Sequence, residues 1–356
     1  MARLELNREM LEAAVRGAFV LGGSGSQEEA LRLGGLALEM GSPVLVDVDD
    51  VNPAGTLVSC STVIVPSGRV APLSPRSHVR AVEILLEGGA ERPSGFIASE
   101  CGGAGIVNGW LEGAILGIPV VDAPCNGRAH PTAEMGSMGL HLVEGYESLQ
   151  AFAGGMPGKE QYVEGLLRGS IKNASNILRY VASSAGGALA VARNPVSASY
   201  AGKCGAPGAV KLAIRLGKAM SEAAVEGLDA LLRTVCGQLG GEVLYRGRVD
   251  SVDRFTAGGM GSGIAVLGEF EVAFWKEYMA LERNGERLAT FPDLIVIFDE
   301  ELQVPVSSGD LLPGRNVSLM AAPRDHLILG AGMRCPDLIE PAEKIMGKEM
   351  LKYLSM

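Results

Sequence analysis

The chain has 356 residues, of which 47% are hydrophobic and 20% are charged, with a formal net charge of −10. This composition is typical of a folded globular protein and excludes a disordered chain. The acidic balance and the absence of a basic run exclude a nucleic-acid partner. No apolar run approaches the length of about 20 residues that spans a bilayer, and the charged N-terminus lacks the apolar core of a signal peptide. We therefore expect a cytoplasmic protein with no membrane association.

The N-terminal residues predict two helices, over 7–20 and 27–40, joined by a glycine-rich loop. Gly22 and Gly23 lie in this loop, before a helix start that could hold an anion or a polar ligand. We therefore take both as candidate substrate-binding residues. The loop is not a dinucleotide-binding motif, because GGSGS departs from GxGxxG and follows a helix rather than a strand. A simple turn between helices is the alternative.

Apolar runs and helical patterns then alternate. Residues 42–51 and 57–66 predict strands, and residues 74–89 predict a helix. Residues 97–141 predict a strand, a glycine-rich turn, a helix, a second strand and a long polar loop. This alternation is typical of an α/β domain with a mostly parallel sheet, which we place over residues 1–170.

The second half predicts helices followed by β structure. Residues 147–153 and 158–182 have helical spacing, residues 187–208 predict a short strand and a small-residue loop, and residues 207–241 predict one bent helix or two helices. After residue 241, apolar and polar residues alternate at period two. This pattern predicts an antiparallel β region, as a small barrel or a sandwich.

Two signals complete this second half. The Asn284-Gly285 pair predicts a hairpin between two of the β runs. Residues 340–356 predict a closing amphipathic helix. Residues 171–356 thus form a predicted C-terminal domain that contains helices and is rich in antiparallel β structure.

Two carboxylates follow apolar runs within residues 97–141. Glu100 ends the run GFIASE, and Asp122 ends the run IPVVDA. Ligands of open α/β sheets bind at the carboxyl ends of strands, and two carboxylates in one crevice can act as acid and base. We therefore predict both as catalytic residues. The alternative is that one of them caps a turn or a helix.

Two cysteines and a histidine lie in the same window. Cys125 or Cys101 could be a nucleophile if His130 or a helix N-terminus lowers the pKa of its thiol; we take Cys125 and His130 as catalytic and Cys101 as substrate-binding. The alternatives are inert buried thiols and a metal bound by His130 with Cys125 or His141. That spacing matches no strong metal motif, and no CxxC pair occurs among the six cysteines. We therefore predict no cofactor, with a divalent metal left open.

The remaining candidates would bind substrate. Gly102 and Gly103, with Asn108 nearby, could present N–H groups to an oxyanion, although a strand-to-helix turn also explains the glycines. Arg128 lies in a stiff loop and suits a carboxylate or a developing anion; a structural ion pair with Asp122 or Glu134 is the alternative. Lys203 is a weaker candidate that could reach the same crevice from the second half.

The chain resembles the S-methyl thiohydantoin desulfurase-like family, which is found beside hydantoinases. No single motif carries the resemblance, but an ordered set of segments extends to about Pro323. In order they are the N-terminal helix with LGGSGS, PVLVDVDDV, SECGG, IPVVDAPCNGRAHP, APGAVKLAIRLGKAM, GGEVLYRGRVDSVDR, ERNGERLATFPDLIVIFDEE and LLPGRNVSLMAAP.

The resemblance implies an α/β N-terminal part, a β-rich C-terminal part and a hydrolase that converts an S-methylated thiohydantoin into a hydantoin and methanethiol. We accordingly expect a small-molecule substrate and a homo-oligomer. An isomerase or lyase acting on a small carboxylate, and a non-catalytic partner subunit of a hydantoinase-type enzyme, remain alternatives.

The chain departs from the usual family pattern within the proposed site. An Asp-Gly pair and a Met usually precede Gly-Arg-Ala, where this chain has Pro124-Cys125-Asn126, and an aromatic residue usually stands at His130. An acid usually stands at Thr132, and the Asn that usually follows the glycine pair closely is displaced to Asn108. These departures leave open another substrate, or a mechanism that uses Cys125 and His130.

Overall fold

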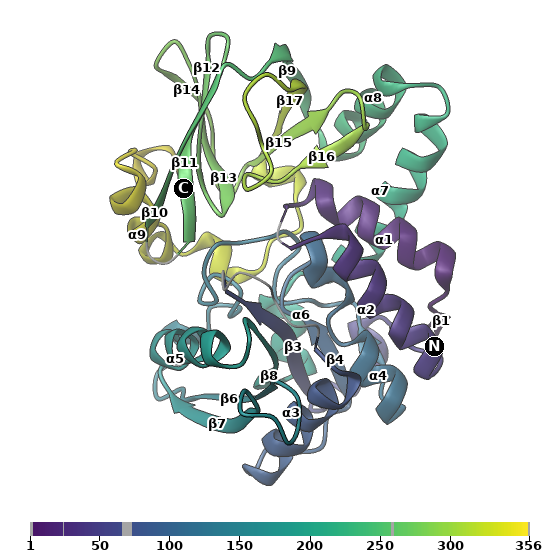
Figure 1. The fold of residues 1–356 in the computed structure, drawn as a ribbon. Helices are drawn as coiled ribbons and strands as arrows, with labels where there is room; N and C mark the ends of the chain where they lie inside the picture. The colour runs from purple at the N-terminus through teal and green to yellow at the C-terminus, as the bar shows by residue number, and fades with distance from the viewer. Residues whose placement is uncertain (1–2, 24, 66–72, 258–259, 355–356) are drawn as a thin grey trace.

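The computed structural model describes residues 3–23, 25–65, 73–257 and 260–354 (Figure 1). A large mixed sheet with its helices occupies the lower part of the view in Figure 1, and a β-rich region occupies the upper part. The order of strands in the large sheet is β1 (Leu4–Glu5), β2 (Val44–Val46), β5 (Val120–Val121), β4 (Gly95–Ala98), β3 (Thr56–Ile64), β8 (Ala188–Ser197), β6 (Ser148–Gly154) and β7 (Val163–Gly169).

The direction of the strands divides this sheet. Strands β2, β5, β4 and β3 run parallel to one another, whereas β1, β8, β6 and β7 pair antiparallel with their neighbours. Helix α3 (Pro75–Glu87) joins β3 to β4, and α4 (Trp110–Leu116) joins β4 to β5, as the alternation in the sequence predicts. The α/β class of the N-terminal part is therefore confirmed.

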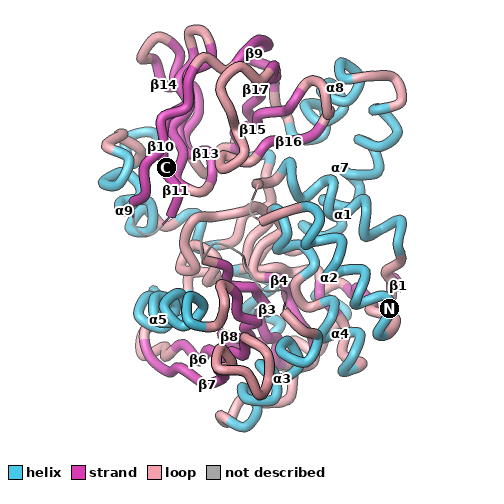
Figure 2. Tube along the Cα trace, in the orientation of Figure 1, coloured by secondary structure: helices cyan, strands magenta, loops and turns pink. Residues whose placement is uncertain are grey.

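Helices cover the large sheet and connect it to the β-rich region (Figure 2). They are α1 (Arg8–Val20), α2 (Gln27–Met40), α3 (Pro75–Glu87), α4 (Trp110–Leu116), α5 (Ile171–Ser184), α6 (Ala198–Cys204), α7 (Ala209–Ala224), α8 (Leu228–Leu239) and α9 (Pro336–Met346). Short 3₁₀ turns occur at η1 (Val48–Asp50), η2 (Gly103–Val107), η3 (Leu140–Leu142), η4 (Arg324–His326), η5 (Ala331–Arg334) and η6 (Leu351–Tyr353). None of the helices in the described ranges is long and apolar enough to cross a lipid bilayer.

The β-rich region is a sandwich of two antiparallel sheets. One contains β10 (Ser251–Ala257), β11 (Met260–Leu267), β12 (Phe270–Trp275), β13 (Glu277–Arg283) and β14 (Glu286–Thr290); the other has the order β16 (Val304–Val306), β15 (Leu294–Asp299), β17 (Asn316–Ala322) and β9 (Glu242–Arg248). Apolar side chains from both sheets form one core between them, including Leu281 from the first and Leu319 from the second. The predicted antiparallel region and the hairpin at Asn284-Gly285, which joins β13 to β14, are confirmed.

Several predicted boundaries were wrong. The helix predicted over 147–153 is strand β6, which begins at Ser148, and the helix predicted over 158–182 is strand β7 followed by α5. Adjacent apolar residues such as Leu166 and Leu167 satisfy helical and strand spacing over so short a run, and pairing with β6 selects the strand. The short strand predicted within 187–208 is the ten-residue β8, and part of the loop predicted after it is α6. The closing helix begins at Pro336 and ends before Gly347.

Strand β8 bears on the predicted domain boundary at residue 170. It follows residue 170, yet it pairs with β3 and β6 of the large sheet. The division into 1–170 and 171–356 remains a prediction, and the chain after residue 170 contributes to both sheet regions.

Helices α1 and α7 pack together through glycine. A Cβ atom on Gly217 would lie 1.8 Å from the carbonyl oxygen of Ala13, and one on Gly17 would lie 2.0 Å from that of Ala213. Only residues without a side chain allow the two backbones to approach so closely. This contact fixes the N-terminal helix against the helix that leads to the β sandwich.

We expect Gly217→Ala to destabilise the protein by about 1–3 kcal/mol, because the added methyl group overpacks the contact between α1 and α7. The matched control is Gly237→Ala in α8, where a Cβ would meet no atom within 4 Å. This control should stabilise the protein by roughly 0.5–1 kcal/mol through helix propensity. Urea unfolding measures both changes, and equal shifts for the two variants would contradict the packing argument.

Candidate functional site

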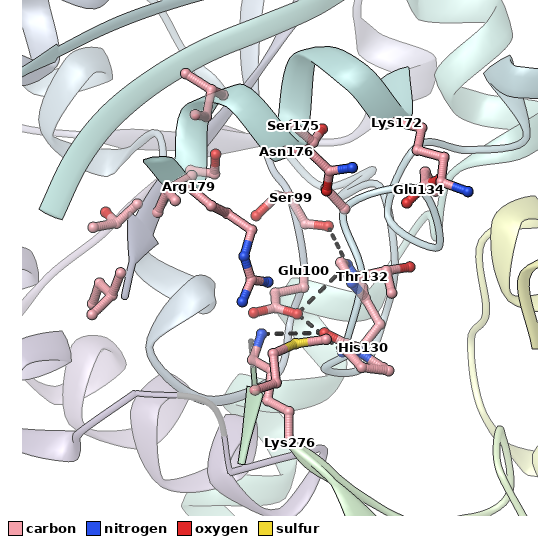
Figure 3. Close-up of a pocket in the computed structure, with 18 of the residues that line it drawn as sticks. Ser99, Glu100, His130, Thr132, Glu134, Lys172, Ser175, Asn176, Arg179 and Lys276 are labelled. Atoms are coloured by element: carbon pink, nitrogen blue, oxygen red, sulfur yellow. Dashed lines mark hydrogen bonds and ion pairs between the residues drawn. The ribbon is translucent and has the colours of Figure 1, made fainter. Parts of the chain in front are cut away.

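A cavity of about 270 Å³ lies where the large sheet meets the five-stranded sheet of the sandwich. Its walls come from β3, from the residues after β4, from the loop of residues 130–134, from α5 and from the junction of β12 and β13 (Figure 3). The charged residues that line it are Glu100, Glu134, Lys172, Arg179, Arg193 and Lys276. Cations therefore outnumber carboxylates among these residues.

Glu100 follows strand β4 and is 8% exposed. Its Oε2 accepts a hydrogen bond of 3.1 Å from the peptide N–H of His130, whereas its Oε1 accepts none from a residue that the structure describes. Burial raises the pKa of Glu100, and the charge of Lys276 and the His130 N–H oppose this rise. A buried carboxylate with a raised pKa is suited to accept a proton near neutral pH.

Two glycines leave the space that this arrangement needs. A Cβ on Gly105 would lie 2.5 Å from Cγ of Glu100, and one on Gly136 would lie 2.3 Å from Nε2 of His130. Larger residues at these positions would displace the carboxylate or the imidazole. The glycine-rich turn after β4 thus makes room for Glu100.

His130 is neutral in this environment. It is 5% exposed, and burial, together with the charge of Lys276, lowers its pKa to about 3. Its Nε2 lies 3.5 Å from the Ser99 carbonyl oxygen and 3.5 Å from Glu100 Oε2. So low a pKa disfavours the imidazole as a base at neutral pH, but its peptide N–H orients Glu100.

Two cations that the sequence analysis did not select face the same cavity. Lys276 connects β12 to β13 with a φ of +62°, and its Nζ donates to the His130 carbonyl oxygen at 3.2 Å. Figure 3 shows Glu100, His130 and Lys276 converging at the centre of the site. Arg193, in β8, is 6% exposed, and burial lowers the pKa of its guanidinium.

The guanidinium of Arg193 forms no hydrogen bond or ion pair with the described residues, although it interacts electrostatically with Glu100. A buried cation without hydrogen-bond partners is costly, so this guanidinium is available to an anionic or carbonyl group of a ligand. The signal in the sequence was a single charge inside the apolar run ALAVARNPV. Lys276 gave a weaker signal, because it stands at the strand junction FWKEY.

Asp122 is a helix cap in the structure. Its carboxylate accepts hydrogen bonds from the backbone N–H groups of Val210, at 2.8 Å, and Lys211, at 3.3 Å, at the start of α7. Burial raises its pKa to about 6, against the effect of those two donors. Asp122 does not belong to the described lining of the cavity, so the geometry supports the alternative reading of this residue over the catalytic one.

Cys101 and Cys125 are buried, and neither belongs to the described cavity wall. The Sγ of Cys125 lies 3.3 Å from Ser59 Oγ in the interior. Burial raises the pKa of both thiols, which disfavours the thiolate that a nucleophile needs. Their proposed roles remain predictions that this geometry does not favour.

The glycine pair and Asn108 lie behind the cavity wall. A Cβ on Gly102 would lie 2.2 Å from the Ala129 nitrogen, and Gly103 begins η2 with a φ of +54°. Both glycines therefore serve a tight turn. The Oδ1 of Asn108 accepts a hydrogen bond of 3.4 Å from Thr62, whose residue lines the cavity.

Arg128 joins the two regions of the molecule. It is 1% exposed, its Nη1 donates to the carbonyl oxygens of Pro292 at 2.8 Å and Asp293 at 2.7 Å, and its guanidinium lies 4.5 Å from the centre of the Phe291 ring. Burial lowers its pKa to about 10. Its hydrogen-bond partners among the described residues are these backbone carbonyls, and not Asp122 or Glu134, the ion-pair partners of the structural alternative.

The last candidates also lie outside the main cavity. Gly22 packs against Ala129, and Gly23 lines a second hollow of about 470 Å³, to which Lys276 also contributes. Lys203 is exposed on α6. Of the residues proposed from the sequence, the structure thus brings together Glu100 and His130 at the main cavity.

We expect Arg128→Met to destabilise the protein by about 2–4 kcal/mol, because two buried carbonyl groups lose their donor while the apolar packing is largely kept. The same replacement at the exposed Lys203 should change the stability by less than about 0.5 kcal/mol. Thermal and urea unfolding measure both effects. Weaker ligand binding at unchanged stability would instead support the substrate-binding role predicted for Arg128.

Comparisons with known proteins agree with this architecture. Residues 9–160 match the family model of the S-Me-THD-like N-terminal domain, and residues 170–333 match that of the S-Me-THD-like C-terminal domain. The crystal structure of a protein from Chromobacterium violaceum, a structural-genomics target, is similar with a TM-score of 0.68 and 25% identity, over 90% of this chain and 92% of that chain. A search of curated proteins found no significant match.

Proposed function

The chain belongs to the S-Me-THD-like family, and we propose that it is a hydrolase of a small hydantoin-like or thiohydantoin-like ring. The family is consistent with a hydantoin-related role. The observation that carries the proposal is Glu100, a buried carboxylate with a raised pKa and one oxygen without a protein donor among the described residues, in a cavity lined by cations. The size of the cavity, about 270 Å³, suits a ligand smaller than a typical drug-sized molecule.

In the proposed reaction, Glu100 accepts a proton from water as the water oxygen bonds to the ring carbon that carries the S-methyl group. The electrons of the C=N bond move to the ring nitrogen. The C–S bond then breaks, its electrons leave with the sulfur, and the proton held by Glu100 passes to that sulfur. The remaining water proton moves from the added oxygen to the ring nitrogen, so that the ring carbon becomes a carbonyl next to an N–H group. The products are the hydantoin and methanethiol, and Glu100 returns to its ionised form.

The cations of the cavity have a clear role in this scheme. Negative charge develops on the ring nitrogen and then on the departing sulfur, and fixed cations in a water-poor site stabilise such charge. Arg193 and Lys276 are the residues we assign to this role. His130 contributes through its peptide N–H, which holds Glu100, and its carbonyl oxygen, which holds the Lys276 ammonium group.

We expect Glu100→Gln to lower kcat/KM for thiol release by about 10²–10⁴-fold, because the amide cannot accept the proton of water. In the wild type, activity should fall as the pH drops through the pKa of Glu100, and burial places that acidic limb above 4.5. Thiol release from S-methylated thiohydantoins over a range of pH measures both effects. A folded Glu100→Gln variant with the wild-type rate and pH profile would overturn the proposal.

We expect Arg193→Met to lower kcat/KM about 10–100-fold, mainly through kcat, as the loss of a charge-assisted hydrogen bond of roughly 1.5–3 kcal/mol to the developing charge predicts, with partial rescue in Arg193→Lys. The control is Cys125→Ser, which should retain activity within about twofold, because Cys125 lies outside the described cavity wall and its thiol is protonated. Steady-state kinetics on the same substrates measure these changes. Loss of thiol release in a folded Cys125→Ser variant would favour the covalent mechanism.

The alternatives from the sequence remain distinguishable. An isomerase or lyase would use Glu100 for proton transfer, so that solvent deuterium would enter a small carboxylate without thiol release. A non-catalytic partner of a hydantoinase-type enzyme would turn over no ring by itself. The proposed homo-oligomer is testable by light scattering.

A further inference from the structure

Three potential metal ligands meet away from the catalytic carboxylate. His141 lies in η3, Cys335 is the residue before α9, and Asp337 lies in the first turn of α9. One ligand atom from each of these side chains lies within 4.8 Å of the other two. They come from two segments that are distant in the sequence, so no metal-binding motif with a short spacing indicates them.

The imidazole of His141 has polar atoms without hydrogen bonds. Both of its ring nitrogens are buried and form no hydrogen bond in the structure, although Nε2 lies 3.2 Å from Asp337 Oδ2. Buried polar atoms normally find a partner. The Cys335 residue is also buried, and its Sγ lies 3.3 Å from the Ala331 carbonyl oxygen.

The one ligand separation that is known individually suits a tetrahedral ion. Two ligands at about 2.0–2.1 Å from a tetrahedral zinc ion lie about 3.3 Å from each other, close to the 3.2 Å between Nε2 and Oδ2. Thiolate, imidazole and carboxylate form a donor set that zinc binds well, whereas calcium and magnesium prefer oxygen alone. The cluster supplies three protein ligands, so a water molecule can complete a tetrahedral set.

We propose that His141, Cys335 and Asp337 form a structural site for a divalent metal ion of the zinc class. The site joins the irregular loop of residues 123–147 to the C-terminal segment that leads into α9. The two segments are already packed together: the Gly330 N–H donates to Asn126 Oδ1 at 3.1 Å, and a Cβ on Gly332 would lie 2.3 Å from the Met135 carbonyl oxygen. The ion would fix the loop that also carries His130 and Glu134, independently of the reaction at Glu100.

The test uses the full-length protein after removal of bound metal with a chelator, titrated with Co²⁺ and then with Zn²⁺. We expect one equivalent of Co²⁺ to bind, with the thiolate charge-transfer and tetrahedral absorption bands of a cysteine-containing site, and Zn²⁺ to displace it. Cys335→Ser should abolish the charge-transfer band. Asp337→Asn, at a side chain that is 55% exposed, should weaken binding by more than about tenfold without loss of folding.

Cys236→Ser is the matched control, because Cys236 lies in α8 and should leave the spectrum unchanged. Zinc should raise the Tm of the wild type and of Cys236→Ser, and raise that of Asp337→Asn less, because binding to the folded state adds stability. The proposal is overturned if the wild type binds neither metal with one-to-one stoichiometry. It is equally overturned if Cys335→Ser and Asp337→Asn give the wild-type spectrum and affinity.

Discussion

The hydrogen bond from the His130 peptide N–H to Glu100 connects the chemistry of the cavity to the fold. One partner is fixed by the end of β4, a buried parallel strand, and the other by a loop with little regular structure. Backbone hydrogen bonds hold that loop on both sides: the Cys125 N–H donates to the Ala98 carbonyl oxygen, and the Ala129 N–H donates to that of Leu21. The position of one carboxylate oxygen therefore depends on packing across the whole α/β region.

Arg128 and Arg193 are both buried, but their hydrogen-bond partners indicate different roles. Arg128 and Arg193 are almost equally inaccessible, and burial lowers the pKa of both. Arg128 donates to two carbonyl oxygens and stacks on Phe291, so the desolvation of its charge is offset within the protein. The guanidinium of Arg193 interacts with the charge of Glu100 but forms no hydrogen bond with a described residue. A ligand group that accepts a hydrogen bond from this guanidinium gains a strong interaction, because little water is present in the buried site to weaken it.

The sequence located part of the site because part of the site is local. Glu100 was identified from a strand end and His130 from the loop that follows the neighbouring strand, and both line the cavity. Asp122 has the same local pattern as Glu100, but its carboxylate accepts a hydrogen bond from the backbone N–H of Val210 at the start of α7. No local pattern distinguishes these two acids, since the difference comes from a helix that begins far along the chain.

The residues missed by sequence reasoning come from the other side of the fold. Arg193 and Lys276 reach the cavity only because β8 returns to the large sheet and the sandwich packs above it. The sequence predicted β8 as a short strand of the C-terminal domain. It therefore gave no reason to place Arg193 beside Glu100. The fold class, by contrast, follows from periodicity and turn residues, which the sequence displays directly.

At the cavity, two glycines have a specific structural role. Gly105 and Gly136 contribute no functional group, yet each occupies a position from which a methyl group would collide with Glu100 or His130. The placement of Glu100 and His130 therefore depends also on neighbours that have no side chain. The sequence thus determines the free space of this cavity through its glycines, just as it determines the charges of the cavity through its ionisable residues.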